Sequence, residues 1–492
     1  MKLQTLILIA SLVICIGFLP GMKAVNPPPD GGYDGGNTAE GQNALLSLGN
    51  GTYNTAVGLF SLLSVTDANF NTGIGAGTLL ANTAEENTAT GAGALLSNTV
   101  GTGNTADGTF ALFSNTEGNN DTASGVSALQ SNTTGSSNTA NGALALSSNT
   151  EGNNNTAIGF SALLSNITGE ANTANGVGAL ESNTEGDLNT ATGEVALTFN
   201  TTGSNNTANG VAALLNNIGG NSNTAIGLSA LHENTSGNSN TAAGDHALFG
   251  NVAGNGNTAT GDSALNNNTN GNLNTAVGEE ALSSNTTGSI NTALGFNAGS
   301  NLTTGDNNID IGANVNGVAG ESNTLRIGNT DITSTFIRGI SGQTIPSGDP
   351  VLVAANGQLG TATSSRRFKD DIQPMDKASE AIFSLKPVTF RYRKEIDPAG
   401  KRQFGLVAED VEKLNPDLIV RDESGRVNSV RYDQVNAMLL NEFLKEHRRN
   451  EEQEATIARL QRQVNALAVT LQKVNTQIEL SRVVSETVLN ER

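Results

Sequence analysis

The chain has 492 residues and a formal net charge of −20, with 58 glycines, no tryptophan and only 4% aromatic residues. So few large side chains exclude an ordinary globular core over most of its length. Segment 25–325 contains 23 acidic residues and no lysine or arginine. It therefore repels phosphate backbones and anionic lipid headgroups, which argues against nucleic acid and membrane surfaces as partners.

The first 24 residues have the features of a secretory signal peptide. Lys2 precedes an apolar run over residues 6–19, and a Pro/Gly-rich spacer follows over residues 25–36. We therefore expect a secreted or cell-surface protein. No later segment approaches the roughly 20 apolar residues of a spanning helix, so we expect no transmembrane segment in the mature chain. The single cysteine, Cys15, lies in the leader, which leaves the mature chain without disulfides or cysteine metal ligands.

A 17-residue repeat occupies residues 37–328. The phrase Asn-Thr-Ala-x-Gly recurs from Asn37 to Gly312, with one spacing shortened to sixteen. Counting that Asn as place one, Leu fills place nine of fifteen consecutive units, from Leu45 to Leu282. Repetition of this kind predicts a mostly β chain built around a β-solenoid, or β-roll.

Within one unit, places one to five suit a short strand. Because side chains alternate along a strand, Asn, Ala and Gly at places one, three and five should face inward, and Thr at place two should face outward. Stacked coils would then form a ladder of buried Asn amides. The interior of one coil appears thin, which favours three chains packed together. The repeat resembles the heads of trimeric autotransporter adhesins, although their repeat is shorter.

The period stops after Gly328, and a β-prone connector covers residues 329–363. Four motifs then follow in order: TSSRRFKDDI at 363–372, LKPVTFRY at 385–392, FGLVAEDV at 404–411 and VRY at 430–432. Together they resemble the intramolecular chaperone auto-processing domain that ends endosialidase-type phage tail spikes and fibres. The resemblance implies a small α+β domain over residues 364–455.

The resemblance also implies self-cleavage by a Ser-Lys dyad, after the domain has trimerised the protein that precedes it. In the family the nucleophilic Ser precedes the Lys by five places, which selects Ser364 and Lys369 as catalytic residues and the bond between Thr363 and Ser364 as the cleavage site. Ser365 stands where the family commonly has Asp. A lysine can remove the serine proton only if burial or nearby positive charge favours the neutral amine. No cofactor or metal is implied.

The last segment, residues 456–490, has the pattern of a coiled coil. Apolar residues alternate in steps of three and four at Leu460, Val464, Leu467, Leu471, Val474 and Ile478, beginning from Ile457. The family resemblance favours three strands and hence a homotrimer. The alternative is a single helix that folds back on its own domain.

These features predict a secreted, trimeric, fibre-like or adhesin-like protein whose tail assembles it and then cleaves itself off, with a cell-surface or glycan receptor as partner. Two other classes stay open. The outward Thr column is compatible with an ice-binding solenoid, although the neighbouring outward place four is irregular. A glycan-active fibre would need a pair of carboxylates, and the acidic pairs at 85–86 and 279–280 are expected on the surface.

Overall fold

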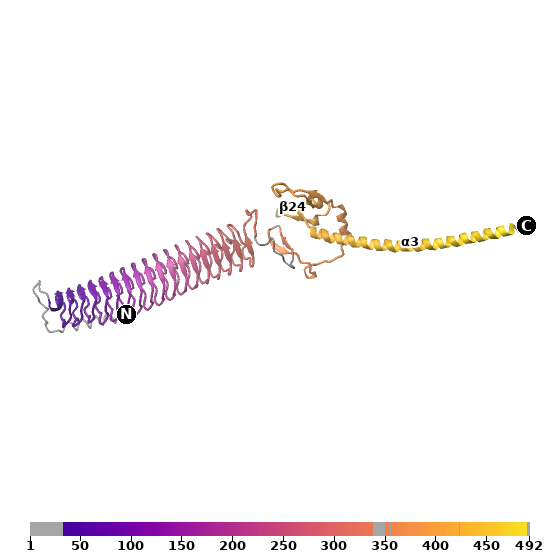
Figure 1. The fold of residues 1–492 in the computed structure, drawn as a ribbon. Coiled ribbons are helices and arrows are strands. Elements are labelled where there is room, and N and C mark those ends of the chain that lie inside the picture. Colours follow the sequence, from indigo (N-terminus) through magenta and orange to yellow (C-terminus); the bar gives the residue numbers. More distant parts are fainter. Residues whose placement is uncertain (1–32, 338–349, 355, 423, 490–492) are drawn as a thin grey trace. The chain divides into compact units, whose positions relative to one another are not determined.

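The computed structural model describes residues 33–337, 350–354, 356–422 and 424–489. The predicted signal peptide lies outside these residues. The chain divides into two compact units between Phe336 and Ile337, an N-terminal repeat unit and a C-terminal unit (Figure 1). Among the described residues, no helix has both the length and the hydropathy required to cross a membrane.

The repeat unit is a parallel β-solenoid with one three-residue strand in each coil (Figure 1). A 3-10 turn, η1 (Asp34–Gly36), precedes the first strand. The strands are β1 (Thr38–Glu40), β2 (Thr55–Val57), β3 (Thr72–Ile74), β4 (Thr88–Thr90), β5 (Thr105–Asp107), β6 (Thr122–Ser124), β7 (Thr139–Asn141), β8 (Thr156–Ile158), β9 (Thr173–Asn175), β10 (Thr190–Thr192), β11 (Thr207–Asn209), β12 (Thr224–Ile226), β13 (Thr241–Ala243), β14 (Thr258–Thr260), β15 (Thr275–Val277), β16 (Thr292–Leu294), β17 (Ile309–Ile311) and β18 (Leu325–Ile327).

Each strand pairs with the next one along the chain, in a register equal to one repeat. Thr38 pairs with Thr55 and Ala39 with Ala56. The one sixteen-residue unit does not change the register of the strands, because Thr72 still pairs with Thr88. The 17-residue period therefore places the same position of every unit in one column, as the sequence predicts.

Three apolar columns form the interior: Ala at places three and eight, and Leu at place nine. The strands have a buried middle residue between two more exposed ones, so Thr at place two faces outward as expected. The expectation of a strand over places one to five is wrong, because the strand covers only places two to four. The Gly at place five has a φ of 115° to 152° and lies in the turn that ends the strand.

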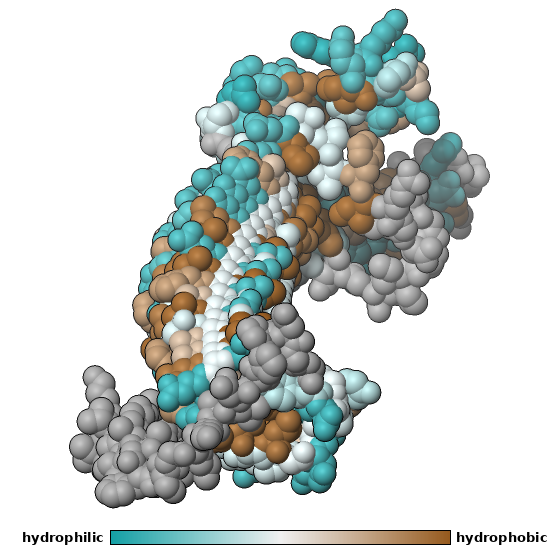
Figure 2. Space-filling view, turned by 90° about the vertical axis from the view of Figure 1, so that its left-hand side faces the viewer, coloured by the Kyte–Doolittle hydropathy of each residue, from teal (hydrophilic) through white to brown (hydrophobic). Residues whose placement is uncertain are grey.

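The close stacking of coils explains why place five is Gly. From Gly41 to Gly295, a Cβ built at this place would lie 2.2–2.8 Å from the backbone of the Gly in the next coil. Any side chain would push the coils apart. Contrary to expectation, the glycine at this place does not face the interior: Gly41 is exposed, and the place-five glycines of later coils are partly exposed. Figure 2 shows a continuous pale stripe along the solenoid, with hydrophobic residues scattered on both sides of it.

Two ladders of buried Asn complete the interior. In the predicted ladder at place one, the backbone N–H of Asn155 donates to Asn138 Oδ1 at 3.0 Å. A second ladder at place twelve was not predicted, and there Asn166 Nδ2 donates to Asn149 Oδ1 at 2.8 Å. Both ladders meet at the carbonyl of Gly169, which accepts from Asn155 and Asn166.

The two Asn ladders complete the thin interior of the solenoid within a single chain. Leu163, Asn155 and Asn166 are all fully buried within one chain. Because their amides have partners in the same solenoid, the interior closes without a second chain. The thickness of the coil is therefore no reason for the solenoid to trimerise.

The C-terminal unit is a small α+β domain with a long final helix, as predicted. Its elements are β19 (Val351–Val353), β20 (Leu359–Thr361), η2 (Arg366–Phe368), η3 (Asp376–Ser384), β21 (Val388–Phe390), β22 (Gln403–Gly405), α2 (Ala408–Glu412), η4 (Pro416–Leu418), β23 (Ile419–Arg421), β24 (Val427–Val430) and α3 (Tyr432–Leu489). The strands form three antiparallel hairpins of two strands each. The buried core consists of Val411, Leu418, Ile419, Val430, Val435 and Met438.

The helix α3 is continuous over 58 residues and includes residues 456–489 of the predicted coiled-coil segment; residue 490 lies outside the described residues. The seam residues from Ile457 to Ile478 are 44–62% exposed. The helix does not fold back to cover this seam with its own domain, so that alternative is not observed. Whether the seam packs against other chains stays a prediction at this point.

Candidate functional site: a Ser-Lys pair at the start of the C-terminal domain

The structure brings Ser364 and Lys369 together. The 3-10 turn η2 lies between them and is closed by hydrogen bonds from Phe368 N–H to Ser365 and from Lys369 N–H to Arg366, both at 3.1 Å. This turn shortens the path between the two side chains, and Lys369 Nζ donates to Ser364 Oγ at 3.1 Å. The spacing of five residues thus gives direct contact between a hydroxyl and an amine.

The surroundings of the pair are open. Ser364, Lys369 and the preceding Thr363 are all exposed on the single chain. The guanidinium of Arg367 lies over the ring of Phe368, 4.6 Å from its centroid, in a cation–π contact. The single chain therefore places the Ser364 hydroxyl, the Lys369 amine and the Thr363–Ser364 peptide bond together on an accessible segment, but it does not bury them.

A second Ser-Lys contact was missed by the sequence analysis. Ser379 in η3 is fully buried, and Lys445 Nζ in α3 donates to its Oγ at 3.3 Å. The Ser379 hydroxyl also donates to Glu442 and accepts from Asn441 Nδ2 at 2.7 Å. The partners are more than 60 residues apart in the chain, so no local spacing reveals them.

The chemistry of this second cluster differs from that of the first. Lys445 Nζ forms an ion pair with Glu442 at 2.5 Å. Hydrogen bonds from Lys445 and Ser379 hold the pKa of Glu442 below its ordinary value. The Glu442 carboxylate accepts hydrogen bonds from both Lys445 and Ser379, so the cluster ties η3 to α3 and does not form an activated nucleophile.

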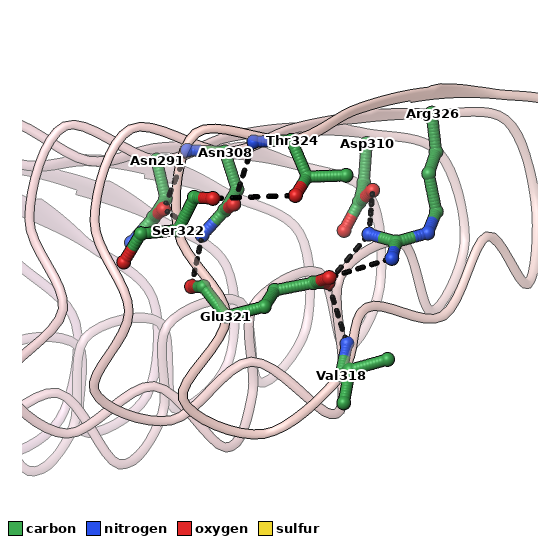
Figure 3. A network of polar contacts seen from close by, with 8 residues as sticks. All are labelled: Asn291, Asn308, Asp310, Val318, Glu321, Ser322, Thr324 and Arg326. Carbon is green, nitrogen blue, oxygen red and sulfur yellow. Dashed lines mark hydrogen bonds and ion pairs between the residues drawn. The ribbon is translucent and has the colours of Figure 1, made fainter. Parts of the chain in front are cut away.

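A third polar network closes the C-terminal end of the solenoid (Figure 3). Asp310 occupies place three, where earlier coils have Ala, and is fully buried. Arg326 lies above it in the next strand, with Nη1 3.7 Å from Asp310 Oδ1. Arg326 also binds both carboxylate oxygens of Glu321, one of them at 2.6 Å. The ladder of Asn291 and Asn308 runs into the same network.

Burial and charge act against each other in this network. Burial raises the pKa of Asp310 above its ordinary value, while the attraction of Arg326 lowers it in part. Although burial opposes it, hydrogen bonding to Arg326 holds the pKa of Glu321 below its ordinary value. Arg326 is the first cationic side chain after the leader, and it places positive charge where the apolar column ends.

The histidines and the acidic pairs of the solenoid lie outside these three clusters. The two solenoid histidines flank Phe249: His232 stacks on its ring at 4.9 Å and His246 lies 5.2 Å from it. Each histidine bonds a neighbouring carboxylate, Glu233 or Asp245, and neither meets a serine in a catalytic triad. Within the described residues, no group of three or more His, Cys, Asp and Glu side chains is arranged to hold a metal ion. The acidic pairs at 85–86 and 279–280 are exposed, as expected.

Comparison with known proteins gives one result for the C-terminal unit. Residues 364–420 match the family model described as chaperone of endosialidase. Neither the search of curated proteins nor the search of solved structures found a match. The match begins at Ser364, the residue placed against Lys369, and it covers the first three of the four motifs, so it confirms the predicted resemblance of this segment to the endosialidase chaperone domain.

Proposed function

We propose that this chain is a secreted, trimeric, fibre-like or adhesin-like protein whose C-terminal domain assembles the trimer and then cleaves itself off between Thr363 and Ser364. The observation that carries the proposal is that the chaperone-family match begins at Ser364, whose hydroxyl lies 3.1 Å from the amine of Lys369. The exposed seam of α3 supports assembly through this unit.

The reaction follows from the position of the hydroxyl on the residue after the scissile bond. Lys369 takes the proton of Ser364 Oγ, and the oxygen attacks the carbonyl carbon of Thr363. The C–N bond breaks, the Ser364 nitrogen takes the proton back from Lys369, and an ester joins the two residues. Water then hydrolyses the ester, which releases the Thr363 carboxylate and restores the Ser364 hydroxyl.

Assembly before cleavage is consistent with the exposure of the pair on one chain. A lysine acts as a base when its surroundings disfavour the ammonium form, and burial is the commonest way to achieve this. A neighbouring subunit that covers Ser364 and Lys369 would supply that burial. Cleavage would then occur once per molecule, after the trimer has formed, and with no external substrate.

The solenoid gives a reason for such a tail. A slip of one whole repeat between chains preserves nearly every contact, so the register between identical rods is poorly specified. A domain that joins three chains at matching points fixes the register and raises their effective concentration. After the tail has been removed, a kinetic barrier keeps the assembled rods from unfolding or dissociating.

The experiment is a comparison of variants by intact mass. Residues 25–492 should separate into two pieces that meet at Thr363/Ser364, and Ser364→Ala and Lys369→Met should both stay whole. Ser365→Ala is the matched control, because it removes the neighbouring hydroxyl and should still be cut. Cleavage of the Ser364→Ala variant, or loss of cleavage in Ser365→Ala alone, would overturn the assignment of the nucleophile.

A further inference from the structure

An apolar groove lies between η3 and α3 in the C-terminal unit. Phe383 from η3 and Leu439 and Phe443 from α3 line it, and they are 72%, 51% and 68% exposed. Charged residues line it as well: Glu380, Glu442, Lys445, Glu446 and Arg449. Leaving two phenylalanines in water beside a small core is unfavourable, which indicates that another surface covers them.

The heptad register of α3 identifies that surface. Phe443 lies two heptads before Ile457, and Leu439 lies three heptads before Leu460. If Ile457 is at position a and Leu460 at position d, Phe443 and Leu439 fall at a and d on the same stripe of the helix. The groove residues of α3 therefore continue the exposed seam of residues 457–478 into the domain.

The charges beside the stripe favour one orientation of the helices. In this register Arg449 is at position g and Glu454 is at position e of the following heptad. In a parallel, in-register coiled coil, these two positions of neighbouring chains lie side by side, so an Arg449 would meet a Glu454 of the next copy. Within one chain the two are five residues apart and do not pair; there Arg449 Nη1 lies 2.9 Å from Glu446 Oε2, and Glu454 of the next copy would join this ion pair.

On the basis of the proposed function, we propose that α3 of a second copy of this chain occupies the groove, in parallel register, with the subunit interface running from Leu439 through Ile478. Phe443 packs against its counterparts, and Phe383 covers the neighbouring helix from the side. The interface thus reaches η3, which the Ser379 cluster ties to α3. Assembly would therefore involve η3, which follows Lys369 by a few residues in the chain.

The seam contains a polar section that sets its register. Three consecutive a and d positions between Phe443 and Ile457 are Glu446, Asn450 and Gln453. A buried polar side chain at an a position lowers stability but penalises shifted alignments, in which it would face an apolar residue. Asn450 should therefore align with its own counterparts and hold the distal and proximal parts of the seam in one register.

Disulfide cross-linking tests the position of the interface. The full chain carries Cys15→Ser and Ser364→Ala, which remove the native thiol and keep the tail attached. Single cysteines are then placed at the distal seam (V464C), in the groove (F443C) and at the polar section (N450C). R448C, on the opposite face at position f, is the control. Under mild oxidation, V464C, F443C and N450C should each give reducible dimers, and R448C should not.

The outcomes separate this inference from the proposed function. If V464C cross-links while F443C and N450C both fail, the groove is not part of the interface, although the distal trimer stands. If all three fail and the chain sediments as a monomer, the proposed assembly falls as well. Using two proximal cysteines guards against misfolding of the Phe443 variant, because Asn450 is exposed and lies outside the core.

A charge exchange tests the register independently. Arg449→Glu and Glu454→Arg should each lower the thermal midpoint of the oligomer, and the double variant should recover most of the loss. Failure of the double variant to recover would contradict a parallel, in-register arrangement. A protein–concentration series shows whether the midpoints report association, since dissociation depends on concentration.

Discussion

Asp121 occupies a place that asparagine fills in the neighbouring coils, and its Oδ1 accepts the backbone N–H of Asn138 at 2.8 Å. In those coils the place-one amide donates to a glycine carbonyl, as Asn104 does to Gly118. A carboxylate cannot donate there, but a carboxylic acid can; Asp121 Oδ2 also accepts from Asn132 Nδ2 at 3.2 Å. Burial raises the pKa of Asp121 to about 7, against the hydrogen bonds from Asn138, which lower it.

The stability of the solenoid should therefore fall as pH rises. The folded chain holds the Asp121 proton more tightly than the unfolded chain, so the acid stabilises the fold below about pH 4, and this contribution is lost between about pH 4 and 7. The full change is on the order of 4 kcal/mol. Asp121→Asn should remove the Asp121 part of this dependence and leave that of Asp310, and it should raise the thermal midpoint at pH 8. Asp107→Asn, at an exposed place four, is the control and should leave the dependence intact.

The place-twelve ladder should carry measurable stability. Asn183→Ala removes the amide that donates to Asn166 Oδ1 and to the Gly186 carbonyl, at 2.8 and 2.9 Å. The acceptor of Asn200 Nδ2 is lost as well, whereas the Gly186 carbonyl keeps Asn172 as a donor. The variant should lose about 1–3 kcal/mol of stability. Urea denaturation followed by circular dichroism measures the change. Asn175→Ala, exposed on strand β9, should shift the midpoint little, and an equal shift would contradict the role of burial.

A second substitution should restore the protection that is lost when the polar network of Asp310, Glu321 and Arg326 is broken. Arg326→Met leaves the Asp310 carboxylate buried without its cation, so the last coils should exchange amide hydrogens faster. The double variant with Asp310→Ala restores the Ala found at place three in earlier coils and should recover protection. Asp306→Asn, an exposed acid four residues before Asp310, is the control. If the amides of β17 and β18 stay fully protected from exchange in the single Arg326 variant, the Asp310–Arg326 ion pair does not stabilise the last coils.

The two Ser-Lys contacts should behave differently. Ser379→Ala removes the tie between η3 and α3 and should lower the stability of the C-terminal unit by about 1–2 kcal/mol, as expected for a buried hydrogen-bonded group. It should slow cleavage without abolishing it, whereas Ser364→Ala should abolish it. Complete loss of cleavage in a folded Ser379→Ala chain would mean that the wrong serine has been assigned.

Much of the fold could be predicted from the sequence because the repeat determines it. A fixed period places identical residues in columns, so the buried Ala and Leu columns and the place-one ladder follow directly from the unit. The backbone at place nine could not be predicted: Leu45 to Leu282 have φ values of 49–54°, a left-handed conformation that leucine rarely adopts. Stacking of successive coils, which no single unit contains, holds it there.

The candidate site divides in the same way. Ser364 and Lys369 are five residues apart, so a single turn joins them, and the family resemblance selects this pair among the many Ser and Lys residues at such a spacing. The Ser379 cluster and the groove around Phe383 depend on how η3 packs against α3, which is a tertiary contact between distant segments. The heptad pattern marked the distal seam, but the polar residues at 446, 450 and 453 hid its continuation to Phe443.

The central claim is that the tail assembles the rod and then leaves it, and native mass spectrometry of the purified product of residues 25–492 tests this most directly. The account predicts a complex of three rods, each ending at Thr363, together with a separate tail that begins at Ser364. An uncut monomer of the full length would contradict both the assembly and the cleavage.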